Sequence, residues 1–338
     1  MTLRPSALLA VLLGLVTLVL GALGLRRSLR VPEVPAPAGP DVVVADDGAR
    51  LHAEVDEVPG SPVTVVFAHG FTARLEEFDL QRETLRGRCR VVLYDQRGHG
   101  RSGWGGPRHA TVDQLGRDLA AVLDRHVPSG PVVLFGHSMG GMTVMSLARQ
   151  RPELFGPRVT GVFLLATSAG DLATSGLLGL YTRVGRRLGL LPVWLWWLGF
   201  TAPLAERLRR RGTRLGYALI RHYLFGRDDA DPATVRWMQD LLEQTPLTIS
   251  AAFYPAMLAY DEFAALPVLG SVPVTVLVGD SDRLTPARHS RRLAQEIGRS
   301  AELVVVPGAG HSVNITRRAV VDDAVLRLLE RSATPAVA

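Results

Sequence analysis

A serine stands between two glycines at Gly136, Ser138 and Gly140, where an apolar run of strand length gives way to a helical pattern. A glycine-rich corner of this kind serves packing, or it holds a nucleophile toward a substrate. Flanking glycines are what a tight strand-to-helix turn requires, because a side chain at either position would clash. We therefore interpret Ser138 as a candidate nucleophile, with a packing corner as the alternative.

A serine nucleophile needs a base that takes its proton and an anion that orients the base. Asp280 and Asp282 lie just past a predicted strand, and His311 lies in a glycine-lined loop after the next one. Sheets of α/β proteins place their sites at the carboxyl ends of the strands. We therefore expect an acid and a base from these two loops to lie close to Ser138.

The elements that would position these residues alternate along the chain. Short β-branched runs and helix-like segments follow one another, and strands that are apolar on both faces predict a mostly parallel α/β sheet flanked by helices. The first two runs, 42–45 and 51–54, flank a turn sequence and predict an antiparallel edge hairpin. Later strands are expected at 63–67, 91–94, 132–135, 162–165, 274–278 and 303–306, and helices at 77–86, 112–125, 139–150, 288–297 and 318–331.

Residues 171–265 break this alternation, since they carry no convincing strand signal and are far too many for a loop. We expect an inserted helical cap there, with the core formed by residues 41–170 and 266–332. An aromatic cluster in the cap is interpreted as its inner wall, with a surface that faces lipid or an acyl chain as the alternative. The cluster comprises Trp194, Leu195, Trp196, Trp197 and Phe200.

The N-terminus differs in kind from the rest of the chain. Residues 7–25 carry no charge, and about 19 residues of helix span roughly 28 Å, close to the hydrocarbon thickness of a bilayer. The run is longer than that of a usual signal peptide, and the arginines after it make a poor cleavage site. We expect residues 1–30 to form a membrane anchor, with a cleaved signal and a secreted protein as the alternative, and residues 31–40 to form a proline-rich linker.

The composition argues against other classes of protein. The 338 residues carry a formal net charge of +6, and all 38 basic residues are arginine, which indicates a compositional bias rather than a nucleic-acid-binding patch. The single cysteine, Cys89, excludes an internal disulfide. No His/Asp/Glu cluster has metal-ligand spacing, and no glycine-rich loop ends as a phosphate loop does, so we expect no metal and no cofactor. The oligomeric state is left open.

Five short motifs together resemble the α/β-hydrolase superfamily, and within it the serine esterases and lipases of the monoacylglycerol lipase and lysophospholipase type. The resemblance extends from about Val42 to Leu329 and is weakest through the expected cap. The motifs are FAHGF at 67–71, DQRGHGRS at 95–102, GHSMGG at 136–141, GDSDRLTP at 279–286 and GAGH at 308–311.

The resemblance implies roles for individual residues. Ser138 would be the nucleophile and His311 the general base. Asp282 would be the orienting acid, because the family's acid usually lies three residues past the glycine that ends the strand. Asp280 would then cap its loop, and Asp171 is a more distant candidate for the acid.

The oxyanion hole would be formed by the backbone N–H groups of Phe71 and Met139, each worth about 3 kcal/mol of transition-state stabilisation. His69 and His99 stand in loops of the family where histidines fix the loop geometry by hydrogen bonds. His137, next to the candidate nucleophile, is likewise expected to be structural.

The reaction implied is the hydrolysis of a carboxylic ester through an acyl-enzyme intermediate. Serine at position 138 argues against the dehalogenase and epoxide hydrolase branches, whose resemblance would require aspartate there. With a membrane anchor and an apolar cap, a lipid-like ester such as a monoacylglycerol or a lysophospholipid is the first hypothesis. Thioester hydrolysis, carbon–carbon bond hydrolysis, acyl transfer and cofactor-free peroxidase chemistry are alternatives, as is a ligand-binding module without catalysis.

Overall fold

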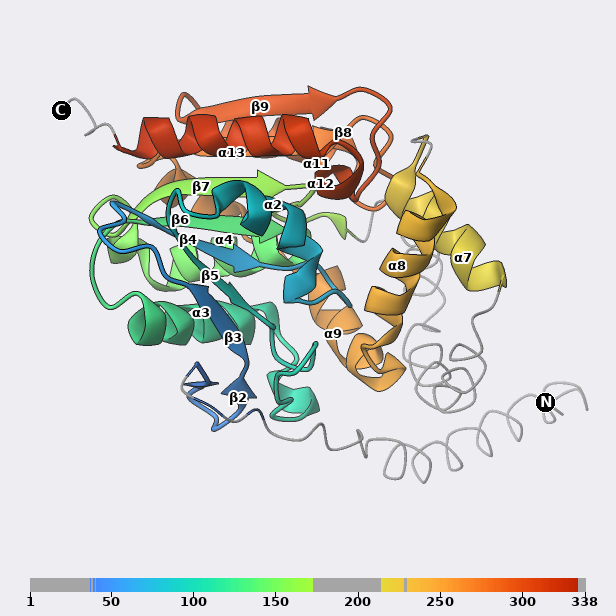
Figure 1. Ribbon diagram of the computed structural model, residues 1–338, viewed down its shortest axis with the longest axis horizontal. Helices are drawn as coiled ribbons and strands as arrows, with labels where there is room; N and C mark the ends of the chain where they lie inside the picture. The colour runs from blue at the N-terminus through green and yellow to red at the C-terminus, as the bar shows by residue number, and fades with distance from the viewer. Residues whose placement is uncertain (1–36, 38, 40, 173–213, 228–229, 334–338) are drawn as a thin grey trace, which may run out of the picture.

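The computed structural model describes residues 37, 39, 41–172, 214–227 and 230–333. In this part of the chain a seven-stranded sheet forms in the order β3-β5-β4-β6-β7-β8-β9 (Figure 1). Only the edge strand β3 is antiparallel to its neighbour, and the other pairs are parallel. The strands are β3 (Ala53–Asp56), β4 (Thr64–Ala68), β5 (Arg90–Tyr94), β6 (Val132–His137), β7 (Val159–Leu165), β8 (Val274–Gly279) and β9 (Ala301–Val306).

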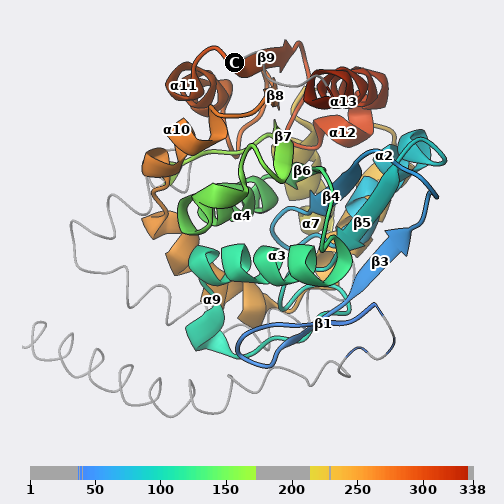
Figure 2. The same cartoon turned by 90° about the vertical axis from the view of Figure 1, so that its left-hand side faces the viewer.

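Helices cover both faces of the sheet (Figure 2). One face carries α3 (Val112–His126), α4 (Met139–Gln150), α10 (Leu266–Leu269) and α11 (Ala287–Ile297), and the other carries α2 (Asp79–Leu85), α12 (Val313–Thr316) and α13 (Arg318–Ala333). Each face buries its own apolar cluster, so the central strands are apolar on both sides. The predicted mostly parallel sheet flanked by helices is thus confirmed.

The predicted turn of the edge hairpin is confirmed. The predicted second strand, 51–54, is wrong, because its residues are divided between two sheets. The strands β1 (Val43–Val44) and β2 (Arg50–Leu51) pair antiparallel as a separate small sheet, and β3 then joins the main sheet. The change occurs at His52, whose N–H donates to Ser102 Oγ at 2.8 Å and whose carbonyl accepts from Asp95 N at 2.9 Å. These contacts with the loop after β5 lie far along the chain, so the local pattern did not reveal them.

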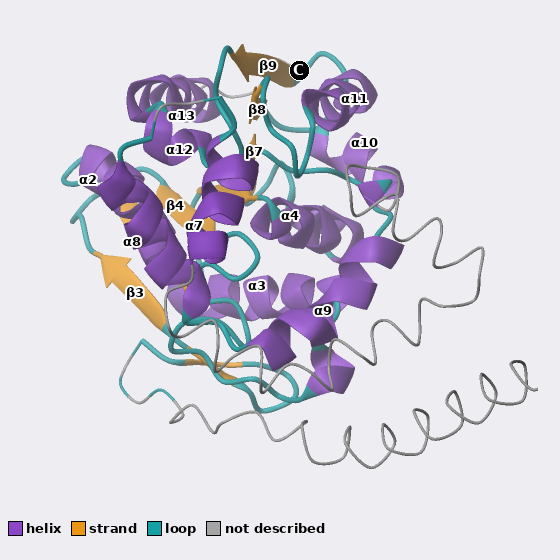
Figure 3. Ribbon diagram, turned by 90° about the vertical axis from the view of Figure 1, so that its right-hand side faces the viewer, coloured by secondary structure: helices purple, strands orange, loops and turns teal. Residues whose placement is uncertain are grey.

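The described part of residues 171–265 is helical. Helix α7 (Arg214–Ile220) continues into the π-helical turn η5 (Arg221–Phe225), and α8 (Pro232–Glu243) and α9 (Leu247–Ala259) follow. These helices lie at the carboxyl ends of the parallel strands (Figures 1 and 3). The bounds of the cap stay a prediction, and the tryptophan-rich cluster at 194–200 lies outside the described residues. The described 3-10 turns of the chain are η1 (Leu75–Phe78), η2 (Pro107–His109), η3 (Pro152–Leu154) and η6 (Phe263–Ala265).

Within the described ranges, no helix combines the length and the apolar character that crossing a bilayer demands. The predicted anchor, residues 1–30, lies outside those ranges, as does all of the linker except residues 37 and 39. The anchor and the linker therefore stay predictions.

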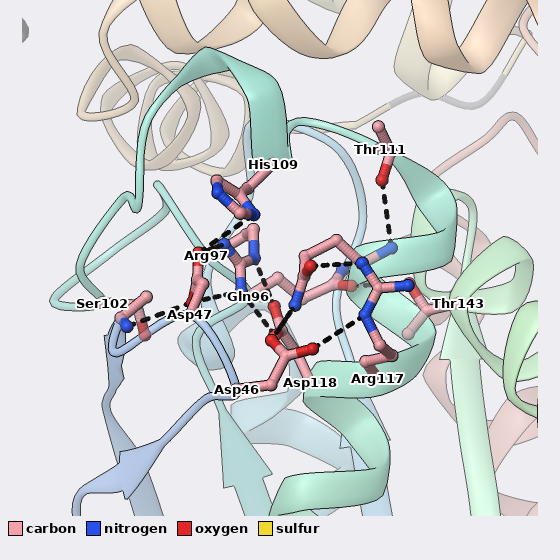
Figure 4. A network of polar contacts seen from close by, with 12 residues as sticks. Asp46, Asp47, Gln96, Arg97, Ser102, His109, Thr111, Arg117, Asp118 and Thr143 are labelled. Atoms are coloured by element: carbon pink, nitrogen blue, oxygen red, sulfur yellow. Dashed lines mark hydrogen bonds and ion pairs between the residues drawn. The ribbon is translucent and has the colours of Figure 1, made fainter.

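A buried arginine ties the turn between β1 and β2 to the core (Figure 4). Arg97, in the loop after β5, has no exposed side-chain surface and donates from Nε and Nη2 to the carboxylate of Asp118 in α3, each at 2.6 Å. Its Nη1 donates to Asp47, between β1 and β2, at 2.7 Å. Burial raises the pKa of the Asp47 carboxyl, but the bond from Arg97 and its charge outweigh this and hold that pKa below its usual value. The bonds from Arg97 to Asp118 and Asp47 fix the loop that follows β5.

Candidate active site

Ser138 occupies a strained turn between β6 and α4. Its backbone has φ 51° and ψ −115°, in a region that costs a non-glycine residue on the order of 1–3 kcal/mol. A Cβ atom at Gly136 would lie 2.5 Å from the carbonyl oxygen of Gly140, and one at Gly140 would overlap that of Ala68. The glycines on either side of Ser138 are therefore required by close packing of the backbone, and they hold the serine at the end of β6.

The imidazole of His311 is bound to the carboxylate of Asp282. His311 Nδ1 lies 2.8 Å from Asp282 Oδ2, and both residues are buried, with 4% of each exposed. The other oxygen, Oδ1, accepts the backbone N–H groups of Leu284 at 2.8 Å and Thr285 at 2.9 Å. Because an ionised carboxylate only accepts, Nδ1 carries the proton and Nε2 of the neutral ring is left as an acceptor.

Thr285 supports the same pair, and sequence reasoning did not single it out. Its hydroxyl lies 2.9 Å from Asp282 Oδ2, 3.3 Å from His311 Nδ1 and 2.8 Å from the carbonyl oxygen of Ala166. The available signal was the spacing Asp-x-x-Thr, which is typical of an aspartate that closes a turn on its own backbone.

The two other candidate acids lie elsewhere. Asp280 is exposed, and its Oδ1 accepts from the backbone N–H of Gly308 and from the hydroxyl of Ser281, both at 2.9 Å. Asp171, after β7, forms an ion pair with Arg292 in α11. The carboxylate that binds the imidazole of His311 is thus that of Asp282.

The two expected oxyanion donors stand beside Ser138. Met139 is the first residue of α4, and Phe71 follows β4 in the loop that lies next to the serine turn. In the described residues neither backbone N–H donates to a protein acceptor. A helix N-terminus also adds a positive electrostatic potential to the first of these groups. Their role as oxyanion donors stays a prediction.

His69 and His99 hold the surrounding loops, as expected. His69 Nδ1 donates to the carbonyl of Gly70 at 2.8 Å, and its Nε2 accepts the N–H of Gln96 at 2.9 Å. His99 Nδ1 donates to the carbonyl of Arg97 at 2.9 Å. Burial lowers the pKa of both imidazoles, that of His99 to about 3, so both are neutral at pH 7.

A cavity of about 520 Å³ opens onto these groups, a size typical of small-molecule sites. Ser138, His311 and Phe71 line it, and the other ionisable side chains with acidic or basic groups among its described lining residues include Glu77, His137 and Arg283. The remaining walls are mostly apolar and come mainly from α4, η5, α8, α9 and the segment after β7. They include Met142, Leu172, Leu224, Leu242, Met257 and Leu258.

Comparison with known proteins identifies the family. Residues 65–324 match the sequence model described as Alpha/beta hydrolase family. The chain belongs to this family. The matched range contains Ser138, Asp282 and His311, so the site just described lies inside the family's shared part.

Its relatives include hydrolases with known structures. A thermophilic esterase from Thermogutta terrifontis is 26% identical, with a TM-score of 0.67 over 87% of this chain and 98% of the esterase. An enol-lactonase from Burkholderia xenovorans LB400 is 25% identical, with a TM-score of 0.65 over 86% of this chain and 99% of the lactonase. A non-heme haloperoxidase of Rhodococcus erythropolis is 28% identical over 85% of this chain and 98% of its own length. These relatives do not single out the monoacylglycerol lipase type.

No group of three or more His, Cys, Asp or Glu side chains suited to a metal ion occurs in the described part of the molecule. The titratable groups around Ser138 pair instead with one another, as His311 does with Asp282 and His137 with Glu77. The expectation of a reaction without metal or cofactor stays a prediction.

Proposed function

We propose that this protein is a serine hydrolase that cleaves carboxylic esters through an acyl-enzyme intermediate. Ser138 is the nucleophile, His311 the general base and Asp282 the acid that orients the base. The observation that carries the proposal is the 2.8 Å contact between His311 Nδ1 and Asp282 Oδ2, beside a cavity that Ser138 and His311 both line. The strained backbone of Ser138 supports it, because strain of this kind gathers at functional sites.

The chemistry follows from the proton positions. Because Nδ1 donates to Asp282, Nε2 of His311 accepts the hydroxyl proton as Ser138 Oγ attacks the ester carbonyl. The imidazolium then returns this proton to the leaving alcohol, and a water molecule activated by the same nitrogen hydrolyses the acyl-enzyme. Asp282 stabilises the imidazolium in both steps. The N–H groups of Phe71 and Met139 bind the developing oxyanion, each worth about 3 kcal/mol.

The substrate we propose is an ester with an apolar acyl group, such as a monoacylglycerol or a lysophospholipid. The mostly apolar walls of the cavity support this choice, since an acyl chain gains free energy when it leaves water for such walls. The predicted N-terminal anchor would hold the domain at a bilayer, where such esters concentrate. A lactone, the substrate class in the name of one relative, is a cyclic ester open to the same attack.

We further propose that the protein is attached to a membrane by a single helix within residues 1–30. The uncharged run at 7–25 supports this. Sequencing of the mature N-terminus and alkaline carbonate extraction of membranes test it. An intact N-terminus in the membrane pellet is expected, whereas a soluble protein that begins after residue 25 would replace the anchor with a cleaved signal.

The function is tested by a screen of esters with the full-length protein and Ser138→Ala, with and without liposomes. The substrates are p-nitrophenyl esters of graded chain length, a monoacylglycerol, a lysophospholipid and a lactone. We expect turnover that is higher for medium or long acyl chains than for acetate, and a loss of about a thousandfold or more in Ser138→Ala. Equal rates in the two proteins would contradict the serine mechanism, and a preference for acetate would contradict the apolar substrate class.

A further inference from the structure

A buried ion pair that the proposed reaction does not use lies against the catalytic residues. Glu77, in η1, and His137, the residue before Ser138, are each 3% exposed, and Glu77 Oε1 lies 2.9 Å from His137 Nδ1. Both side chains line the cavity beside Ser138. Removing two charges from water is costly, and the cost is offset only by good hydrogen bonds. The position of the pair therefore calls for a reason beyond packing.

The hydrogen-bond partners of His137 favour a charged pair. Its Nδ1 faces a carboxylate oxygen, and its Nε2 faces the backbone carbonyl of His311 at 3.2 Å. Both partners are acceptors, so both ring nitrogens donate when the ring is an imidazolium. Burial lowers the pKa of His137 and raises that of Glu77. The charge of each residue shifts the pKa of the other in the opposite direction and outweighs the effect of burial. The pKa of His137 is above its usual value and that of Glu77 is below it.

The pair connects three loops that supply the proposed catalytic groups. Glu77 Oε2 accepts the backbone N–H of Gly70 at 2.8 Å, one residue before the oxyanion donor Phe71. His137 immediately precedes Ser138 at the end of β6. Through Nε2 it donates to the main chain of His311, whose ring centroid lies 4.9 Å from its own.

The packing leaves this arrangement little freedom. A Cβ atom at Gly70 would lie 3.0 Å from His137 Nδ1, so the oxyanion loop lies directly against the ring. The main-chain carbonyl of Glu77 accepts a hydrogen bond from Asn314 Nδ2 at 3.2 Å, three residues after His311. A shift of either side chain would therefore displace the neighbouring loops.

We propose that Glu77 and His137 are positioning residues that set, through one buried ion pair, the relative placement of the Phe71 N–H, the Ser138 hydroxyl and the His311 imidazole. The inference rests on the proposed function. Neither side chain transfers a proton or touches the reacting atoms in this scheme. Misplacement of reacting groups by about 1 Å costs on the order of 100-fold in rate, so loss of the pair lowers turnover more than substrate binding.

Three substitutions of Glu77 separate geometry from charge. In Glu77→Gln the amide oxygen accepts from Gly70, and the amide nitrogen donates to a neutral His137 that keeps Nε2–H on the carbonyl of His311. Glu77→Met has similar size and loses these polar contacts. Glu77→Asp keeps the charge, but its carboxylate is one methylene shorter and does not bridge Gly70 and His137.

Glu262→Met is the matched control. Glu262 is 4% exposed and ion-paired with Arg149 of α4, and neither residue lines the cavity. This substitution also removes a buried carboxylate from an ion pair, here with a partner whose side chain is exposed, so it lowers the melting temperature. Its kcat at 25 °C stays that of the wild type, because its loops are not those of the site.

The test measures kcat, KM and the rate of fluorophosphonate labelling for the full-length wild type and the variants, per folded molecule. We expect Glu77→Met to lose about 10- to 100-fold in kcat and in labelling rate with KM changed less than about threefold, and Glu77→Gln to stay within about threefold of the wild type. If Glu77→Met does not fold, Glu77→Asp takes its place. We then expect the same loss of kcat and labelling rate in Glu77→Asp relative to Glu77→Gln. Wild-type kcat in folded Glu77→Met, or in Glu77→Asp when the Met variant is unfolded, would overturn the proposal.

Hydrogen–deuterium exchange gives a readout that does not depend on turnover. Peptides covering 70–72 and 309–313 should exchange faster in Glu77→Met and Glu77→Asp, but not in Glu77→Gln or Glu262→Met. Unchanged exchange in these peptides would overturn the positioning role. If the wild type is not labelled at Ser138, the proposed function fails, and exchange alone then decides whether the pair holds the loops.

Discussion

The imidazole of His311 and the carboxylate of Asp282 lie 2.8 Å apart, although 29 positions separate them in the chain. The strands that precede them, β8 and β9, are parallel neighbours, and Gly279 pairs with Val306 at their carboxyl ends. The loops that carry the acid and the base therefore begin side by side at one edge of the sheet. Within the motif GDSDRLTP the fourth residue, Asp282, binds the imidazole, whereas the second, Asp280, binds the backbone of Gly308.

The choice of acid is tested by two matched substitutions. Asp282→Asn should lower kcat/KM for a p-nitrophenyl ester about 10⁴-fold, because the amide no longer holds the Nδ1–H tautomer of His311. Asp280→Asn should change kcat/KM less than about threefold, since its carboxylate caps Gly308 and does not touch the ring. Steady-state kinetics on both variants decide the matter, and the opposite ranking would assign the acid to Asp280.

The serine turn should not tolerate a methyl group at Gly140. The Cβ atom would overlap the carbonyl oxygen of Ala68, so Gly140→Ala should lower the free energy of unfolding by about 3 kcal/mol. Gly48→Ala is the control, because Gly48 has φ +84° with nothing within 4 Å and should cost only about 1 kcal/mol. Urea titrations measure both values, and equal losses would show that the clash at Gly140 is relieved elsewhere.

The Arg97 network should stabilise the fold through its buried partner. Asp118→Ala leaves the guanidinium of Arg97 without its closest carboxylate in a buried site and should cost about 3–5 kcal/mol. Arg117→Ala removes the more exposed pair with Asp46, drawn in the same view, and should cost less than about 1 kcal/mol (Figure 4). Chemical denaturation of the two variants tests this contrast. Similar losses would mean that the buried pair contributes no more than the surface pair.

Stability should fall on mild acidification because His99 is buried in its neutral form. Its pKa is about 3 in the folded protein against an ordinary value of 6.5 for histidine, so the unfolded chain binds the extra proton as pH drops below 6.5. This one residue should remove about 2 kcal/mol between pH 7 and pH 5. His99→Phe keeps the ring contacts with Phe71 and Phe253 and should show a correspondingly smaller loss. An unchanged pH slope in the variant would contradict the neutral assignment.

The central strands could be predicted from sequence because both of their faces are buried. Runs such as 132–135 and 274–278 are continuous and apolar, and they coincide with parts of β6 and β8. The edge strand β3 was not separated from β2, because hydrogen bonds from His52 to the distant loop after β5 decide where one sheet ends and the other begins. A local sequence pattern does not indicate pairing with residues far along the chain.

The residues of the site also differ in how well the sequence predicts their positions. Ser138 and its glycines stand in one short motif, and the loop of Asp282 and the loop of His311 each follow a strand, so their sheet edge could be predicted. Glu77 was placed only at the start of a predicted helix, and nothing nearby indicates a buried carboxylate. Its partners, Gly70 and His137, are bound through the folded chain. The roles of the catalytic residues remain predictions that the proposed experiments test.

The most direct test of the central claim is fluorophosphonate labelling followed by peptide mass spectrometry. A single adduct on the peptide that contains Ser138 is expected, formed at a rate that falls with His311→Ala and with Asp282→Asn, and absent in Ser138→Ala. An adduct on another serine, or a folded wild-type protein that forms none under conditions that label a known serine esterase, would contradict the account.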